Sequence, residues 1–138
     1  MSNFFRKKVF TWCLVALGVL FSVLLLNACI KTVTVGDPLE ATLNAGTANI
    51  SLTPNFPVTV TLTSKVPPMG TTIYVTVLDE ASNTAITPQV PAFTTTASVS
   101  SFNIINLPQQ KWCIVNIKLV EVNNKNNTLT KSFRVIYK

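Results

Sequence analysis

The sequence contains no histidine, and only five of its 138 residues are acidic. The missing histidine removes the commonest general base and the commonest zinc ligand, and it excludes hydrolytic triads built on that residue. So few carboxylates also leave little material for acid–base pairs or calcium loops. We therefore expect no enzyme, no metal site and no cofactor.

Basic residues outnumber acidic ones, and the net charge is +6. Three of the basic residues, Arg6, Lys7 and Lys8, lie in the first 28 residues, so that the remainder carries a net charge of only +3. The other basic residues are scattered singly and form no stripe that could neutralise phosphates. Nucleic acid is therefore not an expected partner.

The three cysteines have different surroundings. Cys13 lies inside an apolar run, Cys29 follows the end of that run, and Cys113 is alone in the rest of the chain. If Cys29 is covalently modified, Cys113 has no cysteine to pair with in a disulfide. The folded part must then be held together by its hydrophobic core.

The chain begins with a basic segment, MSNFFRKK, followed by an uncharged run of eighteen residues over 9–26. Basic residues stay on the cytoplasmic side while the apolar run enters the bilayer, as in a signal peptide. Eighteen residues also approach the length of a membrane span, so length alone does not separate a cleaved leader from an uncut helix.

The residues Leu26-Asn27-Ala28-Cys29 resemble the lipobox of bacterial lipoproteins. This resemblance implies cleavage between Ala28 and Cys29, a diacylglyceryl thioether on Cys29 and acylation of its new amino terminus, for instance by palmitate. Asn27 is more polar than usual at its position, and the alternative is an uncut helix with a chance cysteine. The residue after Cys29 is Ile30 and not aspartate, which by the same resemblance implies that the protein is sorted to the outer membrane. Whether it faces the periplasm or the cell surface is left open.

Residues 29–47 follow as the lipidated cysteine and a tether containing Gly36, Pro38 and Gly46, with room for one added edge strand. From residue 48 to residue 138 the hydrophobic pattern has a period of two, which predicts strands. Turn-forming clusters rich in proline, glycine and asparagine separate these stretches. The expected strands lie near residues 50–52, 58–63, 73–78, 102–107, 111–122 and 128–138, the last two forming a hairpin.

About seven short strands separated by turns are typical of an all-β, immunoglobulin-like or fibronectin type III-like antiparallel sandwich. The resemblance is strongest over residues 102–138, where Leu107, Pro108 and Trp112 lie near the family's Leu-Pro-aromatic corner. The aromatic residue is Trp rather than Tyr, and the paired cysteine of antibody domains is missing. Another small sandwich or a jelly-roll fragment is the alternative.

Three aromatic residues, Trp112, Tyr74 and Tyr137, are candidates for a ligand-binding surface because their rings could stack on a sugar. Trp112 is otherwise expected at a corner or on a partly covered sheet face. Among the other polar features, the Asp79-Glu80 pair and the 123–127 asparagine cluster are interpreted as turns rather than as calcium or recognition sites. Cys113 is expected on the inner face as a small buried hydrophobe rather than as a reactive thiol.

These observations predict a cleaved signal peptide at 1–28, a lipidated tether at 29–47 and a sandwich at 48–138. We expect a non-catalytic cell-envelope lipoprotein that serves as an interaction or structural module. The alternative is a glycan-binding surface lipoprotein that uses exposed aromatics. The expected partners are the membrane, through the lipid, and an envelope protein or glycan; the oligomeric state is left open.

Overall fold

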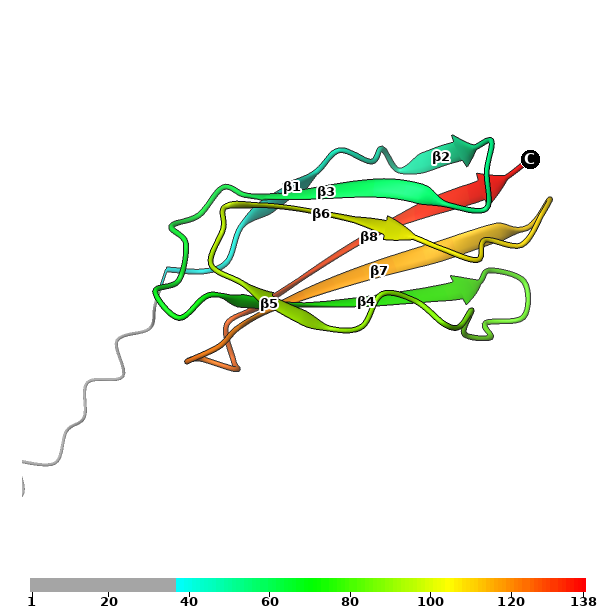
Figure 1. Cartoon of the computed structure of the whole chain (residues 1–138). Coiled ribbons are helices and arrows are strands. Elements are labelled where there is room, and N and C mark those ends of the chain that lie inside the picture. Colours follow the sequence, from blue (N-terminus) through cyan, green and yellow to red (C-terminus); the bar gives the residue numbers. More distant parts are fainter. Residues whose placement is uncertain (1–36) are drawn as a thin grey trace, which may run out of the picture. The chain divides into compact units, whose positions relative to one another are not determined.

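The computed structural model describes residues 37–138, and in this part of the chain it shows eight strands and no helix. The strands form two sheets that pack face to face, so the all-β prediction is confirmed (Figure 1). The strands are β1 (Ala41–Leu43), β2 (Ala48–Ser51), β3 (Phe56–Leu62), β4 (Thr71–Asp79), β5 (Phe93–Thr95), β6 (Val99–Ile104), β7 (Trp112–Glu121) and β8 (Thr128–Tyr137).

The smaller sheet has the order β1-β3-β6, and the larger has the order β2-β8-β7-β4-β5. The expected hairpin is present, since β7 pairs with β8 from Trp112 opposite Ile136 to Val120 opposite Thr128. The expectation of a purely antiparallel sandwich needs one correction. β2 runs parallel to β8, because the chain crosses from β1 in one sheet to β2 in the other without reversing.

β1 is an edge strand of the kind for which the tether range left room, whereas β5 was not expected. β1 lies within the range assigned to the tether and pairs with β3, and Leu39 and Ala41 are buried in the core. The folded unit therefore begins before residue 48. β5 follows a proline-containing segment and is only three residues long, too short for a period-two pattern to stand out.

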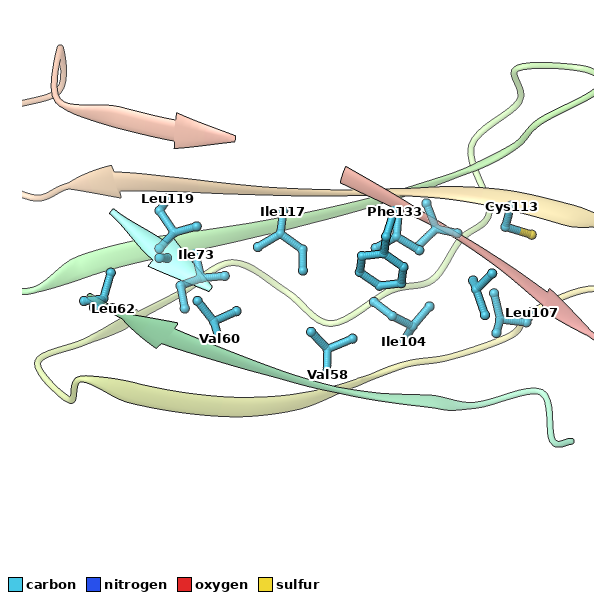
Figure 2. Close-up of a cluster of buried hydrophobic side chains, with 14 of the residues drawn as sticks. Val58, Val60, Leu62, Ile73, Ile104, Leu107, Cys113, Ile117, Leu119 and Phe133 are labelled. Carbon is cyan, nitrogen blue, oxygen red and sulfur yellow. The ribbon is translucent and has the colours of Figure 1, made fainter. Parts of the chain in front are cut away.

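The core lies between the sheets and consists mainly of inward-facing strand residues, joined by Leu39 and Leu107 from outside the strands (Figure 2). In β3, Val58, Val60 and Leu62 are buried while the threonines between them are half-buried, as the alternation predicts. Burial of each such aliphatic side chain contributes about 1.5–3 kcal/mol, which explains why the sandwich needs no disulfide. Two aromatic pairs bridge the sheets, Phe56 with Phe133 and Phe93 with Phe102, at ring-centroid distances of 5.7 and 5.8 Å.

One buried polar group has no partner among the described residues. The side chain of Thr71 is fully buried, and its hydroxyl oxygen makes no hydrogen bond. We expect Thr71→Val to raise the free energy of unfolding by about 1 kcal/mol, because it replaces an unsatisfied hydroxyl with a methyl group of similar size. Chemical denaturation of the detergent-solubilised protein measures this change in the free energy of unfolding.

The neighbouring Thr72→Val variant is the matched control. The Thr72 hydroxyl lies on the outer face at 2.9 Å from the hydroxyl of Thr94, so its removal breaks an existing hydrogen bond. This variant should be neutral or less stable. A loss of stability in Thr71→Val comparable with that in Thr72→Val would show that the Thr71 hydroxyl has a partner after all.

The two ends of the sandwich are formed by different loops and segments of the chain (Figure 1). The described chain begins at what we call the Asp37 end, beside the β3–β4 loop (63–70) and the β7–β8 turn (122–127). The chain finishes at the opposite, Lys138 end, beside residues 52–55, 80–85 and 105–111. Hydrogen bonds from the amide of Leu107 to Pro54, of Gln110 to Tyr137 and of Lys138 to Ser51 join the segments at the Lys138 end.

Candidate functional site

The three aromatic candidates do not form one platform. Trp112 is half-buried on the outer face of the larger sheet, because its neighbour Cys113 points into the core. Tyr74 lies on the same face and is 45% exposed, but it pairs with Lys118, six residues along β7 from Trp112 and therefore about 20 Å away. Tyr137 is half-buried and packs against the core. Of the three, Trp112 lines the cleft described below.

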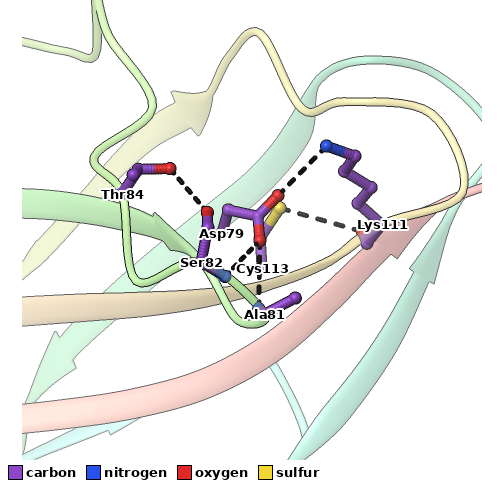
Figure 3. Close-up of polar contacts among 6 residues, drawn as sticks. All are labelled: Asp79, Ala81, Ser82, Thr84, Lys111 and Cys113. Atoms are coloured by element: carbon purple, nitrogen blue, oxygen red, sulfur yellow. Dashed lines mark hydrogen bonds and ion pairs between the residues drawn. The ribbon is translucent and has the colours of Figure 1, made fainter.

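The Asp79-Glu80 pair lies next to Trp112, since Asp79 is opposite Cys113 in the β4–β7 register. Asp79 closes the turn that follows β4, as expected (Figure 3). Its Oδ1 accepts hydrogen bonds from the amides of Ala81 and Ser82, both at 3.0 Å, and its Oδ2 lies 3.5 Å from the ammonium nitrogen of Lys111. The hydrogen bond from the Ser82 amide, followed by weaker contacts that include Lys111, lowers the pKa of Asp79 in spite of the opposing effect of burial.

Glu80 forms a second ion pair, with Arg134, whose guanidinium group lies over the Trp112 ring. The guanidinium carbon of Arg134 lies 4.5 Å from the ring centroid, and its Nη2 donates a hydrogen bond of 2.6 Å to Glu80 Oε2. Both partners of this ion pair are partly exposed, so it contributes no more than about 1 kcal/mol. Its structural effect is to order the side chains around Trp112, because the cation also interacts with the ring.

Asp79, Glu80 and Trp112 border a partly open cleft of about 460 Å³ at the Lys138 end. This volume lies within the range of small-ligand sites. The carboxylates of Asp79 and Glu80 each already hold a cation, so they offer no free pair for acid–base catalysis. To a polar ligand the cleft can offer the indole of Trp112, the amide of Gln110 and the ammonium group of Lys111. The cleft is lined by Asp79, Glu80, Ala81, Ser82, Gln110, Lys111 and Trp112.

Sequence reasoning identified Trp112 and the acidic pair but did not bring them together, and it passed over Gln110, Lys111 and Arg134. The strand register supplies the missing link, because it places residue 79 beside residue 113. A sequence pattern that points to the cleft was present in Gln110-Lys111-Trp112, where two polar residues precede an aromatic residue at the start of a strand.

Exposed apolar side chains lie near the cleft. Ile50 on the edge strand β2 is 57% exposed, and Leu52, just after that strand, is 82% exposed. Ile50 is opposite Ile136 in β8, which in turn is opposite Trp112 in β7. An apolar row therefore crosses the outer face from β2 to the cleft, and such rows are typical of contact surfaces.

Cys113 is fully buried, which confirms the inner-face interpretation. Burial, with a smaller contribution from the negative charge of Asp79, raises the pKa of its thiol to about 11 from an ordinary value of 9.0. Only the thiolate reacts with alkylating reagents, so two pKa units alone slow the reaction by about 100-fold. We expect no alkylation of Cys113 in the native protein at pH 8 and rapid alkylation in denaturant, measured by peptide mass spectrometry.

The same shift predicts a loss of stability in alkali. The fold favours the neutral thiol, so this contribution is complete below pH 9 and is lost as the pH rises from 9 towards 11. In Cys113→Ala the fall in unfolding free energy over this range should be less steep than in the parent. Equal slopes, or fast alkylation of the native protein, would contradict the buried neutral thiol.

The asparagine cluster forms the expected turn between β7 and β8, and its last member has a further role. The Asn127 side chain accepts a hydrogen bond from the Leu39 amide at 3.0 Å, and it donates to the Asp37 carbonyl at 3.0 Å and to Glu121 Oε2 at 2.7 Å. Asn127 therefore fastens the start of the described chain to this turn.

The lipidation and cleavage residues, Ala28 and Cys29, lie outside the described residues, as does the whole of the expected signal peptide at 1–28. Over residues 37–138 no helix has the length and apolarity of a membrane span. Within the same residues no group of histidine, cysteine, aspartate and glutamate side chains could hold a metal ion.

Comparison of the chain with protein-family models, with curated proteins and with solved structures gives no match. The function must therefore be argued from the residues themselves.

Proposed function

We propose that this protein is a non-catalytic lipoprotein of the bacterial cell envelope, in which a lipid on Cys29 anchors one sandwich domain that serves interaction or structure. The observation that carries the proposal is the Leu26-Asn27-Ala28-Cys29 sequence at the end of a basic and then apolar leader. The folded unit supports it, because Leu39 is already part of the core only ten positions after Cys29. A domain so close to the cysteine is suited to display on an anchor.

The sheet order supports an immunoglobulin-like identity for the domain. Such domains place their first, second, fourth and fifth strands in one sheet and their third, sixth and seventh in the other, and the variable type adds strands beside the third. The fourth strand has no counterpart in the smaller sheet here. Here β1, β3 and β6 form one sheet and β4, β7 and β8 lie together in the other, with β5 beside β4. Folds of this kind serve many functions, so the architecture favours binding only weakly.

Mass spectrometry of the protein extracted from its native membrane tests the anchor. We expect an amino terminus at Cys29 that carries two or three acyl chains, because one chain binds a membrane only marginally. Mild alkali, which hydrolyses ester-linked chains, should lower this mass. An intact Met1, or an unmodified Cys29, would overturn the proposal.

Glycan binding is the second candidate, and the cleft beside Trp112 favours it. The cleft combines the aromatic side chain of Trp112 with the polar side chains of Gln110 and Lys111, a combination that suits a ring bearing hydroxyl groups. Glycan-array binding by the parent protein, lost in Trp112→Ala and kept in Tyr74→Ala, would support this function. Identical glycan profiles for the two variants would count against it.

A further inference from the structure

The Asp37 end of the domain is joined to the lipid-bearing residue by a short stretch of chain. Asn127 holds Asp37 and Leu39 through their main-chain groups, so the chain leaves the domain at a defined place beside the β7–β8 turn. Only residues 30–36 separate this place from Cys29. Eight residue steps span at most about 28 Å even when fully extended.

This maximum span is shorter than the sandwich is long. β7 has ten residues, which corresponds to about 33 Å, and it runs from one end of the domain to the other. For the domain to stand inverted, with only its Lys138 end on the bilayer, the connecting segment would have to span about 33 Å, which is more than its full length. The Asp37 end, by contrast, can reach the headgroups without extension of the segment, because the segment joins that end directly.

The surface at the Asp37 end fits such a neighbour. Met69, near the end of the β3–β4 loop, is 57% exposed and follows the exposed Pro68, which gives the loop an apolar tip. Lys65 is exposed on the same loop, and Lys125 is exposed on the neighbouring β7–β8 turn. Lysines keep their ammonium groups at the level of the headgroups while their stems cover apolar surface.

The three acidic residues at this end, Asp37, Glu40 and Glu121, outnumber the two lysines by only one. The contact therefore has no strong electrostatic component and depends on the short connection and on the apolar tip. Its strength should vary little with salt.

We propose that the bilayer surface itself is the partner of the Asp37 end, where the 63–70 and 122–127 loops rest against the headgroups. The inference rests on the proposed lipid anchor at Cys29. Its consequence is that the cleft beside Trp112 and the exposed Ile50 and Leu52 face away from the membrane. That end is then the one that an envelope protein or glycan can reach.

The native cysteines leave the chain suited to a direct test, because a lipidated Cys29 and a buried Cys113 do not take up a thiol-reactive fluorophore. Met69→Cys and Leu52→Cys place a single probe at either end, and the parent protein is the labelling blank. The lipidated proteins are reconstituted in vesicles of phosphatidylethanolamine and phosphatidylglycerol, and quenching by acrylamide is measured. We expect the probe at position 69 to be quenched severalfold less than the probe at position 52.

A second pair of variants carries a flexible insertion of about twenty residues between Gly36 and Asp37, which adds on the order of 25 Å of reach. This insertion should make the two probes equally accessible. Equal quenching without the insertion, in protein that floats with the vesicles, overturns the proposed orientation but leaves the anchor intact. Protein that fails to float with the vesicles overturns the lipid anchor, and the orientation with it.

Discussion

Cys29→Ala is expected to yield a protein that retains residues 1–28 and incorporates no labelled palmitate. The reason is chemical: only a thiol can form the thioether, and in lipoproteins the peptidase cuts before the modified cysteine. The parent should instead appear as a shorter, acylated species beginning at residue 29. Gel mobility, metabolic labelling and intact mass, measured side by side, report the difference.

The chain provides a matched control for this experiment. Cys13→Ala removes the other leader cysteine, which lies inside the apolar run rather than at its end. It should leave cleavage and acylation unchanged, because the run keeps its length and stays uncharged. If Cys29→Ala matched the parent in size and in palmitate incorporation, residues 9–26 would have to be an uncut membrane helix.

Gly70→Ala is expected to destabilise the domain by on the order of 3 kcal/mol. Gly70 ends the turn before β4 and has a φ of +85°, a conformation that residues with a Cβ rarely adopt. A Cβ at this position would lie 2.5 Å from the main-chain oxygen of Thr95 and 3.0 Å from its carbonyl carbon. Because these are backbone atoms of the edge strand β5, relief would require the strand pair to move apart.

Gly46→Ala is the control for the Gly70 variant. Its added Cβ would meet only the Asn49 side chain, at 3.8 Å, which is an ordinary contact. We expect its stability to equal or slightly exceed that of the parent. The midpoints of chemical denaturation, compared at constant m-value, measure the stability of both variants. A Gly70→Ala variant as stable as Gly46→Ala would mean that the turn before β4 does not have the described backbone.

Much of this protein was determined by local sequence. The alternation of apolar and polar residues predicted β3, β4, β7 and β8, and the inner position of Cys113, because side chains of a strand alternate between its faces. The turn at Asp79 was predictable for a similar reason, since a short acidic side chain accepts hydrogen bonds from the amides that follow it. The lipobox, likewise, is a contiguous motif, although its chemistry stays a prediction.

Only the tertiary structure decided which residues meet. β5 is too short to show a period and was missed, and for β1 the sequence left room only for an edge strand somewhere in the tether range. The parallel pairing of β2 with β8 depends on a crossover between sheets. The cleft joins residues 79–82 to residues 110–112, and Asn127 reaches Asp37 across 90 positions. Such contacts depend on register and sheet packing, which follow from the burial of the whole core and not from any local pattern.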